Sequence, residues 1–331
     1  MKELTFPSHG VACAGWHLPA RTDALADPAG RPCVVMAHGF GGTRDTGLIS
    51  YAEGFADAGI DVLLFDYRSF GDSEGVPRQD VSFRRQRQDY HAAISAARHL
   101  PGVDPERIAL WGTSYSGGHV IAAAAQDGRI AAVVSMTPAT DGLAASVQSA
   151  RYAGAGQILR TAGHGFRDLT RRITRRQPHH IPVVAQPGSV AIISTSGAYE
   201  AYTSIAGPTW RNEVGARTAL EVTLNRSIAY AGRLGCPILV QAGTHDRVAP
   251  PAAARRAAKK AGALAELREY PVDHFDVYAG PWQQRMLRDQ LGFLVRALAR
   301  RNVGATAGPR SCPVDENRCG ATLPAYLKDL R

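Results

Sequence analysis

The chain has 331 residues, of which 45% are hydrophobic and 20% charged, so it can bury the core of one globular domain with an insertion. It lacks a run of about 18 apolar residues, which argues against a membrane-spanning helix. The formal net charge is +9. Arginine is concentrated at residues 84–87 and 167–176, but no nucleic-acid-binding signature accompanies these clusters, so we predict no specific nucleic-acid partner.

Short apolar runs alternate with longer helical stretches along most of the chain. Residues 4–18 are predicted to add one or two antiparallel edge strands. Further strands are predicted at 33–37, 62–65, 108–111, 131–136, 237–242 and 266–270, and helices at 46–58, 82–100, 116–126, 252–261 and 281–300. Buried runs between helices are typical of a mostly parallel sheet that is covered on both faces. The sequence therefore predicts an α/β fold.

A glycine-rich loop follows the first of the predicted parallel strands, with the sequence His-Gly-Phe-Gly-Gly at residues 38–42. Because glycine has no Cβ, such a loop can bring backbone N–H groups close to a developing negative charge. We predict the N–H of Phe40 as one donor of an oxyanion hole. The alternative is an ordinary turn between a strand and a helix.

Ser114 lies between a predicted strand and a predicted helix, in the run Gly-Thr-Ser-Tyr-Ser at residues 112–116. A serine at such a reversal adopts a strained backbone that exposes its hydroxyl, and small residues two before and two after it relieve crowding. Ser116 stands where the usual pattern has a second glycine. The pattern predicts Ser114 as a nucleophile and the N–H of Tyr115 as the second oxyanion donor, although so short a pattern also recurs by chance.

An acid and a base follow the last two predicted strands. Asp246 comes after the strand at 237–242, and His274 after the strand at 266–270. The order serine, acid, histidine is the one expected when all three sit on successive strand ends of one sheet. Asp246 has an alternative role as a helix or turn cap. Asp273 and Asp276 flank the histidine too closely in sequence to reach its ring while the ring faces the serine.

The regular alternation breaks between residues 138 and 232, a stretch too long for a simple loop. We predict a core of residues 1–137 and 233–301, a cap of residues 138–232 over the strand ends, and a loosely attached tail at 302–331. Within the cap, residues 144–160 and 167–176 are predicted to be helical. Its aromatic residues are candidates for pocket walls or core packing: Tyr152, Phe166, Tyr199, Tyr202 and Trp210.

The chain start lacks the apolar segment of a secretory signal, so we expect a cytoplasmic location. The cysteines fit that expectation. Cys13, Cys33 and Cys236 fall in strand-like runs and are predicted to be buried thiols. Cys312 and Cys319, in the predicted tail, are close enough to form a local disulfide, but the cytosol would keep them reduced.

Taken together, these motifs resemble those of the α/β-hydrolase superfamily over residues 5–300. The nearer likeness is to bacterial serine hydrolases related to dienelactone hydrolases and X-Pro dipeptidyl-peptidase-like esterases. It rests on the runs at 38–42, 66–75, 112–116, 243–246 and 273–276. The resemblance implies a Ser114, Asp246 and His274 triad with no metal and no organic cofactor. It does not identify the substrate, because one fold supports many chemistries.

We therefore predict a serine hydrolase that cleaves a carboxylic ester, lactone or thioester of a small molecule through an acyl-enzyme intermediate. An X-Pro-type peptidase and an acyltransferase with the same triad are the alternatives within catalysis. Outside catalysis, one alternative is a non-catalytic binding protein with this fold, and another is that the basic clusters serve association with a membrane surface or with nucleic acid. The oligomeric state is left open, a homodimer included.

Overall fold

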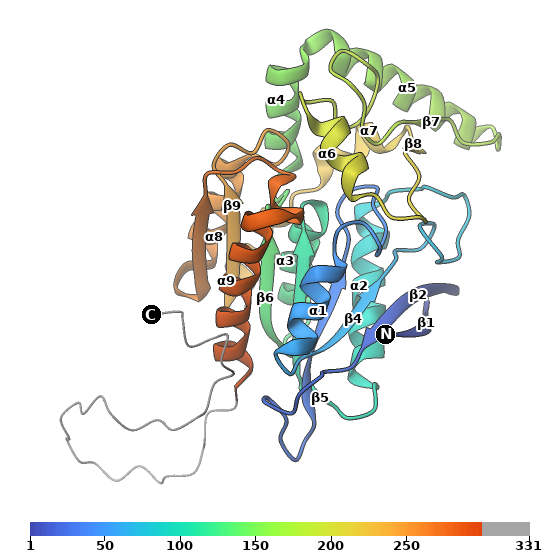
Figure 1. The fold of residues 1–331 in the computed structure, drawn as a ribbon. Coiled ribbons are helices and arrows are strands. Elements are labelled where there is room, and N and C mark those ends of the chain that lie inside the picture. The colour runs from blue at the N-terminus through green and yellow to red at the C-terminus, as the bar shows by residue number, and fades with distance from the viewer. Residues whose placement is uncertain (300–331) are drawn as a thin grey trace. The chain divides into compact units, whose positions relative to one another are not determined.

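An eight-stranded sheet forms the centre of the computed structural model, which describes residues 1–299 (Figure 1). The strand order is β1-β2-β4-β3-β5-β6-β9-β10. The strands are β1 Lys2–Ser8, β2 Val11–Leu18, β3 Arg31–Ala37, β4 Asp61–Phe65, β5 Val103–Thr113, β6 Ile130–Met136, β9 Ile238–Gly243 and β10 Ala265–Tyr270. Strands β1 and β2 run antiparallel at one edge and the others are mutually parallel. The predicted fold and its edge strands are confirmed.

Helices cover both faces of this sheet (Figure 1). Their bounds are α1 Ile49–Asp57, α2 Phe83–Arg98, α3 Tyr115–Gln126, α8 Pro251–Ala261 and α9 Gly280–Leu298. The apolar sides of α2, α3 and α8 pack into one core, and those of α1 and α9 pack into a second core on the opposite face. The central strands of the sheet are therefore shielded from water on both faces.

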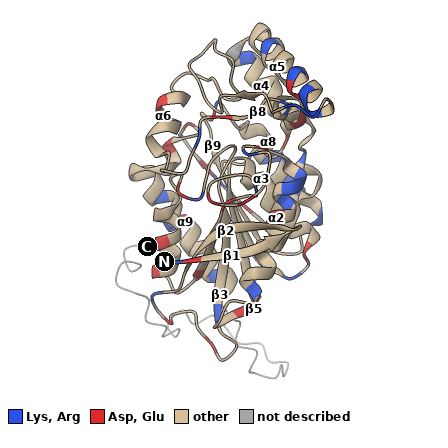
Figure 2. Cartoon of the chain, turned by 90° about the vertical axis from the view of Figure 1, so that its right-hand side faces the viewer, with Lys and Arg blue, Asp and Glu red and all other residues tan. Residues whose placement is uncertain are grey.

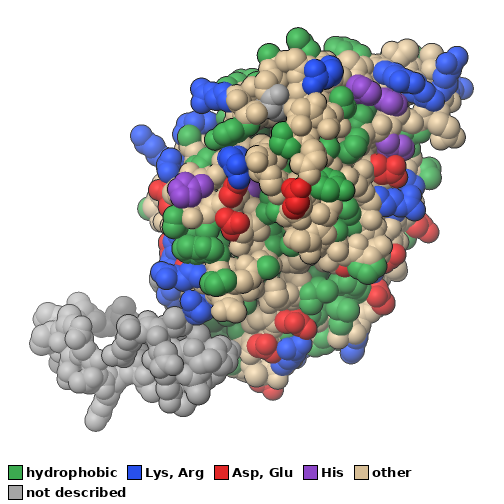
Figure 3. Space-filling model, turned by 45° about the horizontal axis from the view of Figure 1, so that its top comes forward, with side chains coloured by type: hydrophobic (Ala, Val, Ile, Leu, Met, Phe, Trp, Pro, Cys, Tyr) green, Lys and Arg blue, Asp and Glu red, His purple; other side chains and the backbone are tan. Residues whose placement is uncertain are grey.

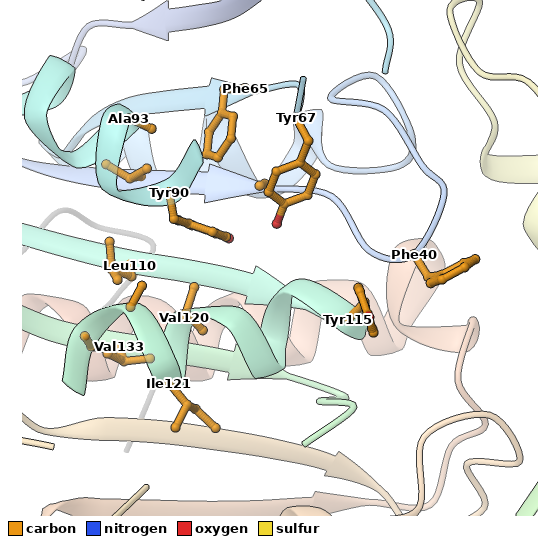
Figure 4. Packing of buried hydrophobic residues seen from close by; sticks show 14 of the residues in the cluster. Phe40, Phe65, Tyr67, Tyr90, Ala93, Leu110, Tyr115, Val120, Ile121 and Val133 are labelled. Atoms are coloured by element: carbon orange, nitrogen blue, oxygen red, sulfur yellow. The ribbon is translucent and has the colours of Figure 1, made fainter. Parts of the chain in front are cut away.

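Alternation along the strands divides the apolar residues between the two cores. In β3, Val35 belongs to one core, whereas Val34 and Met36 belong to the other, because successive side chains of a strand point to opposite faces. Figure 4 shows the first of these cores, where Tyr90 of α2 and Val120 of α3 lie against Leu110 and other strand residues. This double burial explains why the parallel strands read as unbroken apolar runs.

The chain between β6 and β9 forms a layer at one end of the molecule (Figure 1). Its elements are α4 Gly142–Ala153, α5 Ala155–Ile173, β7 His180–Ile181, α6 Ala198–Ile205, β8 Val214–Gly215 and α7 Thr218–Glu221, with three short 3-10 turns after α7. We call residues 138–232 the insertion. Its treatment as a separate cap stays a prediction, as do the other domain boundaries. The predicted tail, with Cys312 and Cys319, lies outside the described residues.

Two expectations for the insertion were wrong. The break between its first helices falls at Gly154, whose φ of +83° glycine adopts readily, and not within residues 161–166. Tyr152, Phe166 and Tyr199 are exposed, so they form neither core nor pocket wall. Cys13, Cys33 and Cys236 are buried free thiols, as predicted.

None of the helices in residues 1–299 combines the length and apolarity that crossing a bilayer requires. The cytoplasmic location stays a prediction.

Candidate active site

Ser114 occupies the sharp turn between β5 and α3. Its φ of 55° and ψ of −115° lie outside the regions that residues with a Cβ normally adopt. Gly112 permits this turn, because a Cβ at that position would lie 2.4 Å from the carbonyl oxygen of Ser116. The local sequence therefore folds into a strained elbow that presents the Ser114 hydroxyl beyond the end of the strand.

Ser116 does more in this elbow than occupy a small space. Its Oγ accepts a hydrogen bond from the backbone N–H of Thr113 at 2.8 Å and lies 2.8 Å from the carbonyl oxygen of Ala37, to which it donates. Ala37 is the last residue of β3, immediately before the glycine-rich loop. A second glycine here could make neither bond, so the departure from the usual pattern ties the elbow to the neighbouring strand.

The Ser114 hydroxyl is hydrogen-bonded to His274, and His274 to Asp246. The distances are 2.9 Å from Ser114 Oγ to His274 Nε2 and 2.7 Å from His274 Nδ1 to Asp246 Oδ2. All three side chains are buried. They come from the chain segments after β5, β10 and β9 respectively, which meet because the carboxyl ends of parallel strands share one edge of the sheet. The structure thus brings together the three residues that the sequence singled out.

The second oxygen of the Asp246 carboxylate accepts hydrogen bonds from the loop that contains Asp246. Oδ1 accepts hydrogen bonds from the backbone N–H groups of Val248 and Ala249 at 2.8 and 2.7 Å. The capping role that the sequence left open and the contact with His274 therefore coexist, one on each oxygen. These bonds fix the plane of the carboxylate and so the direction in which it accepts from His274.

The neighbouring acids are engaged elsewhere. Asp273 accepts hydrogen bonds from the backbone N–H and from Nε of Arg247 at 3.0 and 2.7 Å. Asp276 accepts from the backbone N–H of Asp273 at 2.8 Å. Burial is the largest single influence on the pKa of Asp273 and acts to raise it. Hydrogen bonds from the backbone N–H groups of Arg247 and His274 and from the Arg247 guanidinium together outweigh burial, so the pKa lies below its usual value.

Phe40 and Tyr115 both line the cavity next to Ser114. Their rings pack edge to face with centroids 5.3 Å apart. Tyr115 is the first residue of α3, so its N–H has no partner within the helix. Within residues 1–299 no hydrogen bond engages the N–H of either residue. Both predicted donors are therefore unengaged, and their role as an oxyanion hole stays a prediction.

Two residues of the insertion hold the loop that carries Phe40, and sequence reasoning missed this role. Tyr202 Oη donates to the carbonyl oxygen of Phe40 at 2.9 Å, and Trp210 Nε1 donates to that of Gly41 at 3.0 Å. The two rings stack on each other, with centroids 5.1 Å apart. From their aromatic character alone, we could predict only that these residues form a pocket wall or part of the core. Because they are more than 160 residues away from the loop in sequence, no local pattern indicated a contact with it.

His38 stands at the start of the same loop and is fully enclosed. Its Nδ1 lies 2.9 Å from the carbonyl oxygen of Gly39, while Nε2 has no partner within residues 1–299. Burial lowers the pKa of His38 to about 4. The imidazole is therefore neutral near pH 7, with Nδ1–H as the donor to Gly39.

The segment 66–75, which contributed to the family resemblance, is hydrogen-bonded to Arg44, two residues after the glycine-rich loop. Asp66 accepts hydrogen bonds from the backbone N–H of Arg44 at 2.6 Å and from its guanidinium at 2.9 Å. A Cβ at Gly71 would lie 2.2 Å from Asp66 Oδ2, so glycine is required there. The segment is structural, and none of these three residues lines the cavities beside Ser114.

A cavity of about 500 Å³ opens beside Ser114. Its walls come from the elbow, from α4 and α5, and from the chain around residues 191–195 and 219–224. Most of the wall is aliphatic or small, including Ile158, Ala162, Ile193, Leu220 and Val222. Among the described lining residues Arg247 alone is charged, and it is paired with Asp273. The cavity therefore suits an uncharged, largely apolar group.

Residues 1–299 contain no group of three or more His, Cys, Asp or Glu side chains arranged to hold a metal ion. The expectation that no metal or cofactor takes part stays a prediction.

Residues 28–272 match the family model described as serine aminopeptidase, S33 (Hydrolase_4). The chain belongs to this family. Membership confirms the predicted α/β-hydrolase superfamily, and the crystal structure of the α/β hydrolase GrgF from Penicillium sp. sh18 agrees with it. That structure superposes with a TM-score of 0.74 over 90% of this chain and 99% of its own, at 26% identity.

Named relatives of this S33 family member have several functions. The quorum-quenching protein AidA of Acinetobacter baumannii is 36% identical over 89% of this chain and 94% of its own length. The thiohydrolase aneE of Aspergillus aculeatus is 46% identical, but over only 33% of this chain and 35% of its own. The polyketide transferase grgF of Penicillium sp. is 32% identical over 55% of this chain and 56% of its own. These names point to a hydrolase or an acyltransferase and to no single substrate.

Proposed function

We propose that the protein is a serine hydrolase that cleaves a carboxylic ester, lactone or thioester through an acyl-enzyme intermediate. The observation that carries the proposal is the buried chain of hydrogen bonds from Ser114 through His274 to Asp246. Such a chain activates a hydroxyl that is otherwise a weak nucleophile. An unused donor pair at Phe40 and Tyr115 supplies the second requirement of acyl transfer, stabilisation of the oxyanion.

In the first half-reaction, Ser114 Oγ attacks the substrate carbonyl and His274 Nε2 takes the hydroxyl proton. The carbonyl oxygen becomes negative and accepts hydrogen bonds from the N–H groups of Phe40 and Tyr115. His274 then gives its proton to the leaving alcohol or thiol as the bond from the acyl carbon to that group breaks. Asp246 keeps Nδ1 protonated and stabilises the imidazolium, so Nε2 is free to accept.

In the second half-reaction, water attacks the acyl-enzyme with His274 again as the base, which releases a carboxylic acid and restores Ser114. A small void of about 20 Å³ is bordered by both Ser114 and His274. That volume suffices for about one water molecule. An acyl group in the large cavity would leave this void open beside His274. A water molecule in the void could then act as the nucleophile, which supports hydrolysis.

The large cavity supports an apolar acyl group. At about 500 Å³ it falls within the usual range of small-molecule pockets, roughly 300–1,000 Å³, and its one charged wall residue is neutralised by Asp273. The partly matching relative named a thiohydrolase supports thioesters within this class.

The family name includes aminopeptidases, but this cavity gives them little support. A free amino terminus is recognised by buried acceptors or a carboxylate, since leaving an ammonium unpaired in an apolar site costs several kcal/mol. No Asp or Glu is among the described lining residues. An X-Pro-type peptidase is therefore a weaker candidate than an esterase or thioesterase.

An acyltransferase with the same triad is the second candidate, and the relative named a polyketide transferase favours it. The two reactions share the acyl-enzyme and differ in whether water or another nucleophile resolves it.

The test is a substrate panel measured with the protein and with Ser114→Ala. Short- and medium-chain nitrophenyl esters, acyl thioesters, lactones and X-Pro anilides should be compared, with small alcohols and amines added as acceptors in a second series. We expect turnover of apolar esters or thioesters that requires Ser114. Product partitioning toward an added acceptor would select the transferase, and the absence of turnover for every substrate would select the non-catalytic binding protein.

A further inference from the structure

Helix α5 carries three large apolar residues on its solvent side. Leu159, Phe166 and Ile173 are 72%, 61% and 75% exposed. They are spaced by seven residues, which returns almost to the same direction after two helical turns, so they form one stripe along the helix. We call these three residues the outer face.

The fully buried positions of α5 are polar or small. Its buried residues are Gln157, Thr161, Gly165 and Asp168. Gln157 donates to the carbonyl oxygen of Ser189 at 2.7 Å, and Asp168 pairs with Arg217 at 3.0 Å. The helix is thus amphipathic in the reverse of the usual sense, in which the apolar stripe faces the core. The apolar stripe has no partner within residues 1–299 that buries it.

Arginines without acidic partners surround this stripe. Residues 142–176 contain one acidic residue, the buried Asp168, and seven arginines. Six of those arginines are exposed and take part in no ion pair within residues 1–299: Arg151, Arg160, Arg167, Arg172, Arg175 and Arg176. Figure 2 shows Lys and Arg positions concentrated along α5, and Figure 3 shows that hydrophobic side chains are also exposed at this end of the molecule.

In the second basic cluster, residues 84–87, two of the three arginines have polar partners. On α2, Arg85 forms an ion pair with Asp80, and Arg87 is buried with its guanidinium bonded to Asn225. Arg84, the third arginine of that cluster, is exposed and forms no ion pair within residues 1–299. What distinguishes α4 and α5 is that six unpaired arginines lie between residues 151 and 176, the stretch that also carries the apolar stripe.

We propose that the outer face of α5 binds the surface of an anionic lipid bilayer. An apolar stripe flanked by arginines is the pattern of helices that lie in the membrane interface, with apolar side chains among the acyl chains and guanidinium groups at the phosphates. A second copy of this chain is the weaker occupant, because apposing two such faces would bring together like charges with no acid between them. The proposal does not depend on the proposed hydrolase activity.

The position of the helix gives this contact a consequence for the cavity. Ile158, Thr161 and Ala162, on the other sides of α5, line the cavity beside Ser114. The helix that would rest on the lipid is therefore also a wall of the apolar site.

Vesicle co-sedimentation of the full chain tests the proposal. The vesicles are phosphatidylcholine with and without phosphatidylglycerol, and the Ser114→Ala protein is measured in parallel so that binding is scored without turnover. We expect binding that requires the anionic lipid and weakens as salt is raised above about 0.1 M. Phe166→Asp should reduce the partition coefficient at least about tenfold, because it removes an inserted ring and adds a repelled charge.

Matched variants separate this face from the general positive charge. Val76→Asp changes a residue that is 86% exposed elsewhere and should have little effect. Arg167→Gln with Arg172→Gln should reduce binding about tenfold, whereas Arg129→Gln with Arg285→Gln, which removes the same charge at other exposed sites, should change it far less. Circular dichroism checks the fold of each variant.

Three results would overturn the proposal. The first is that the protein does not sediment with anionic vesicles. The second is that the α5 variants and their matched controls lose vesicle binding equally. The third is that sedimentation velocity shows a dimer that Phe166→Asp dissociates, while vesicle binding is absent.

Discussion

Ser116 Oγ donates a hydrogen bond to the carbonyl oxygen of Ala37 at 2.8 Å and so joins the first turn after the candidate nucleophile to the end of β3. The loop with Phe40 begins one residue beyond Ala37. The serine that departs from the usual elbow pattern thus connects the two segments that would supply the nucleophile and the oxyanion donors. We expect these segments to keep their relative position only while this bond is intact.

Ser116→Ala should destabilise the protein by about 1–3 kcal/mol, because it leaves the N–H of Thr113 and the carbonyl of Ala37 buried without this partner. Turnover should fall with little change in KM. Urea unfolding and steady-state kinetics measure the two effects. Ser95→Ala, at an exposed helical position, is the control and should shift stability by less than about 0.5 kcal/mol. Equal stabilities for the two variants would contradict the account.

Tyr202→Phe should lower kcat about tenfold and leave KM nearly unchanged. The variant keeps the ring but removes the hydroxyl that holds the carbonyl of Phe40, and the cost is that of one buried hydrogen bond, about 1–2 kcal/mol. Tyr199→Phe is the matched control on the same helix, since Tyr199 is exposed. If both variants behave alike, α6 does not position the loop through this bond.

The sequence was sufficient to predict that Ser114, Asp246 and His274 come together, because all three lie at fixed places in a parallel sheet. Ser114, Asp246 and His274 each follow a strand, and the strand ends meet at one edge whatever the lengths of the connections. The sheet was predictable for a related reason: strands such as β4 and β9 are buried on both faces and read as continuous apolar runs. Local pattern and global topology agree there.

The insertion could not be read in the same way, because its contacts are specific pairs between distant residues. Nothing near Tyr202 in sequence indicates that its hydroxyl reaches Phe40. The orientation of α5 was also unpredictable from periodicity, since the ordinary rule places Leu159 and Phe166 inside, and the structure places Asp168 and Gln157 there instead. Buried partners such as Arg217 for Asp168 decide that orientation.

Stability should fall as the pH drops below about 6.5, with His38 as one cause. Because burial holds the pKa of His38 at about 4 in the folded state, below the ordinary value of 6.5, the unfolded chain binds more protons between these values. The contribution of His38 to stability therefore rises with pH across that window and is constant above it. His38 should contribute about 2 kcal/mol of loss between pH 7.5 and 5.

Urea unfolding of the protein and of His38→Gln at several pH values measures this contribution. His119 is also buried with a lowered pKa, so the variant should retain part of the pH dependence. An unchanged slope in His38→Gln would show that the loop histidine titrates normally.

Asp246→Asn should reduce kcat by about 10³- to 10⁴-fold if the hydrogen-bond chain works as proposed. The carboxamide can present its N–H₂ to His274 Nδ1, which forces the proton onto Nε2 and prevents that nitrogen from accepting from Ser114. Asp273→Asn alters the adjacent acid, which is bonded to Arg247 instead, and should keep kcat within about tenfold. Steady-state kinetics on one ester decide the matter, and a reversed order of the two variants is the contrary result.

The most direct test of the central claim is to treat the protein with a fluorophosphonate probe and locate the adduct by mass spectrometry of its peptides. Such probes react with an activated serine hydroxyl and mimic the attacked carbonyl group. The account predicts one adduct, on Ser114, with labelling abolished in Ser114→Ala and strongly slowed in Asp246→Asn. An adduct on another residue, or labelling of the Ser114→Ala protein at the rate of the unaltered protein, would contradict it.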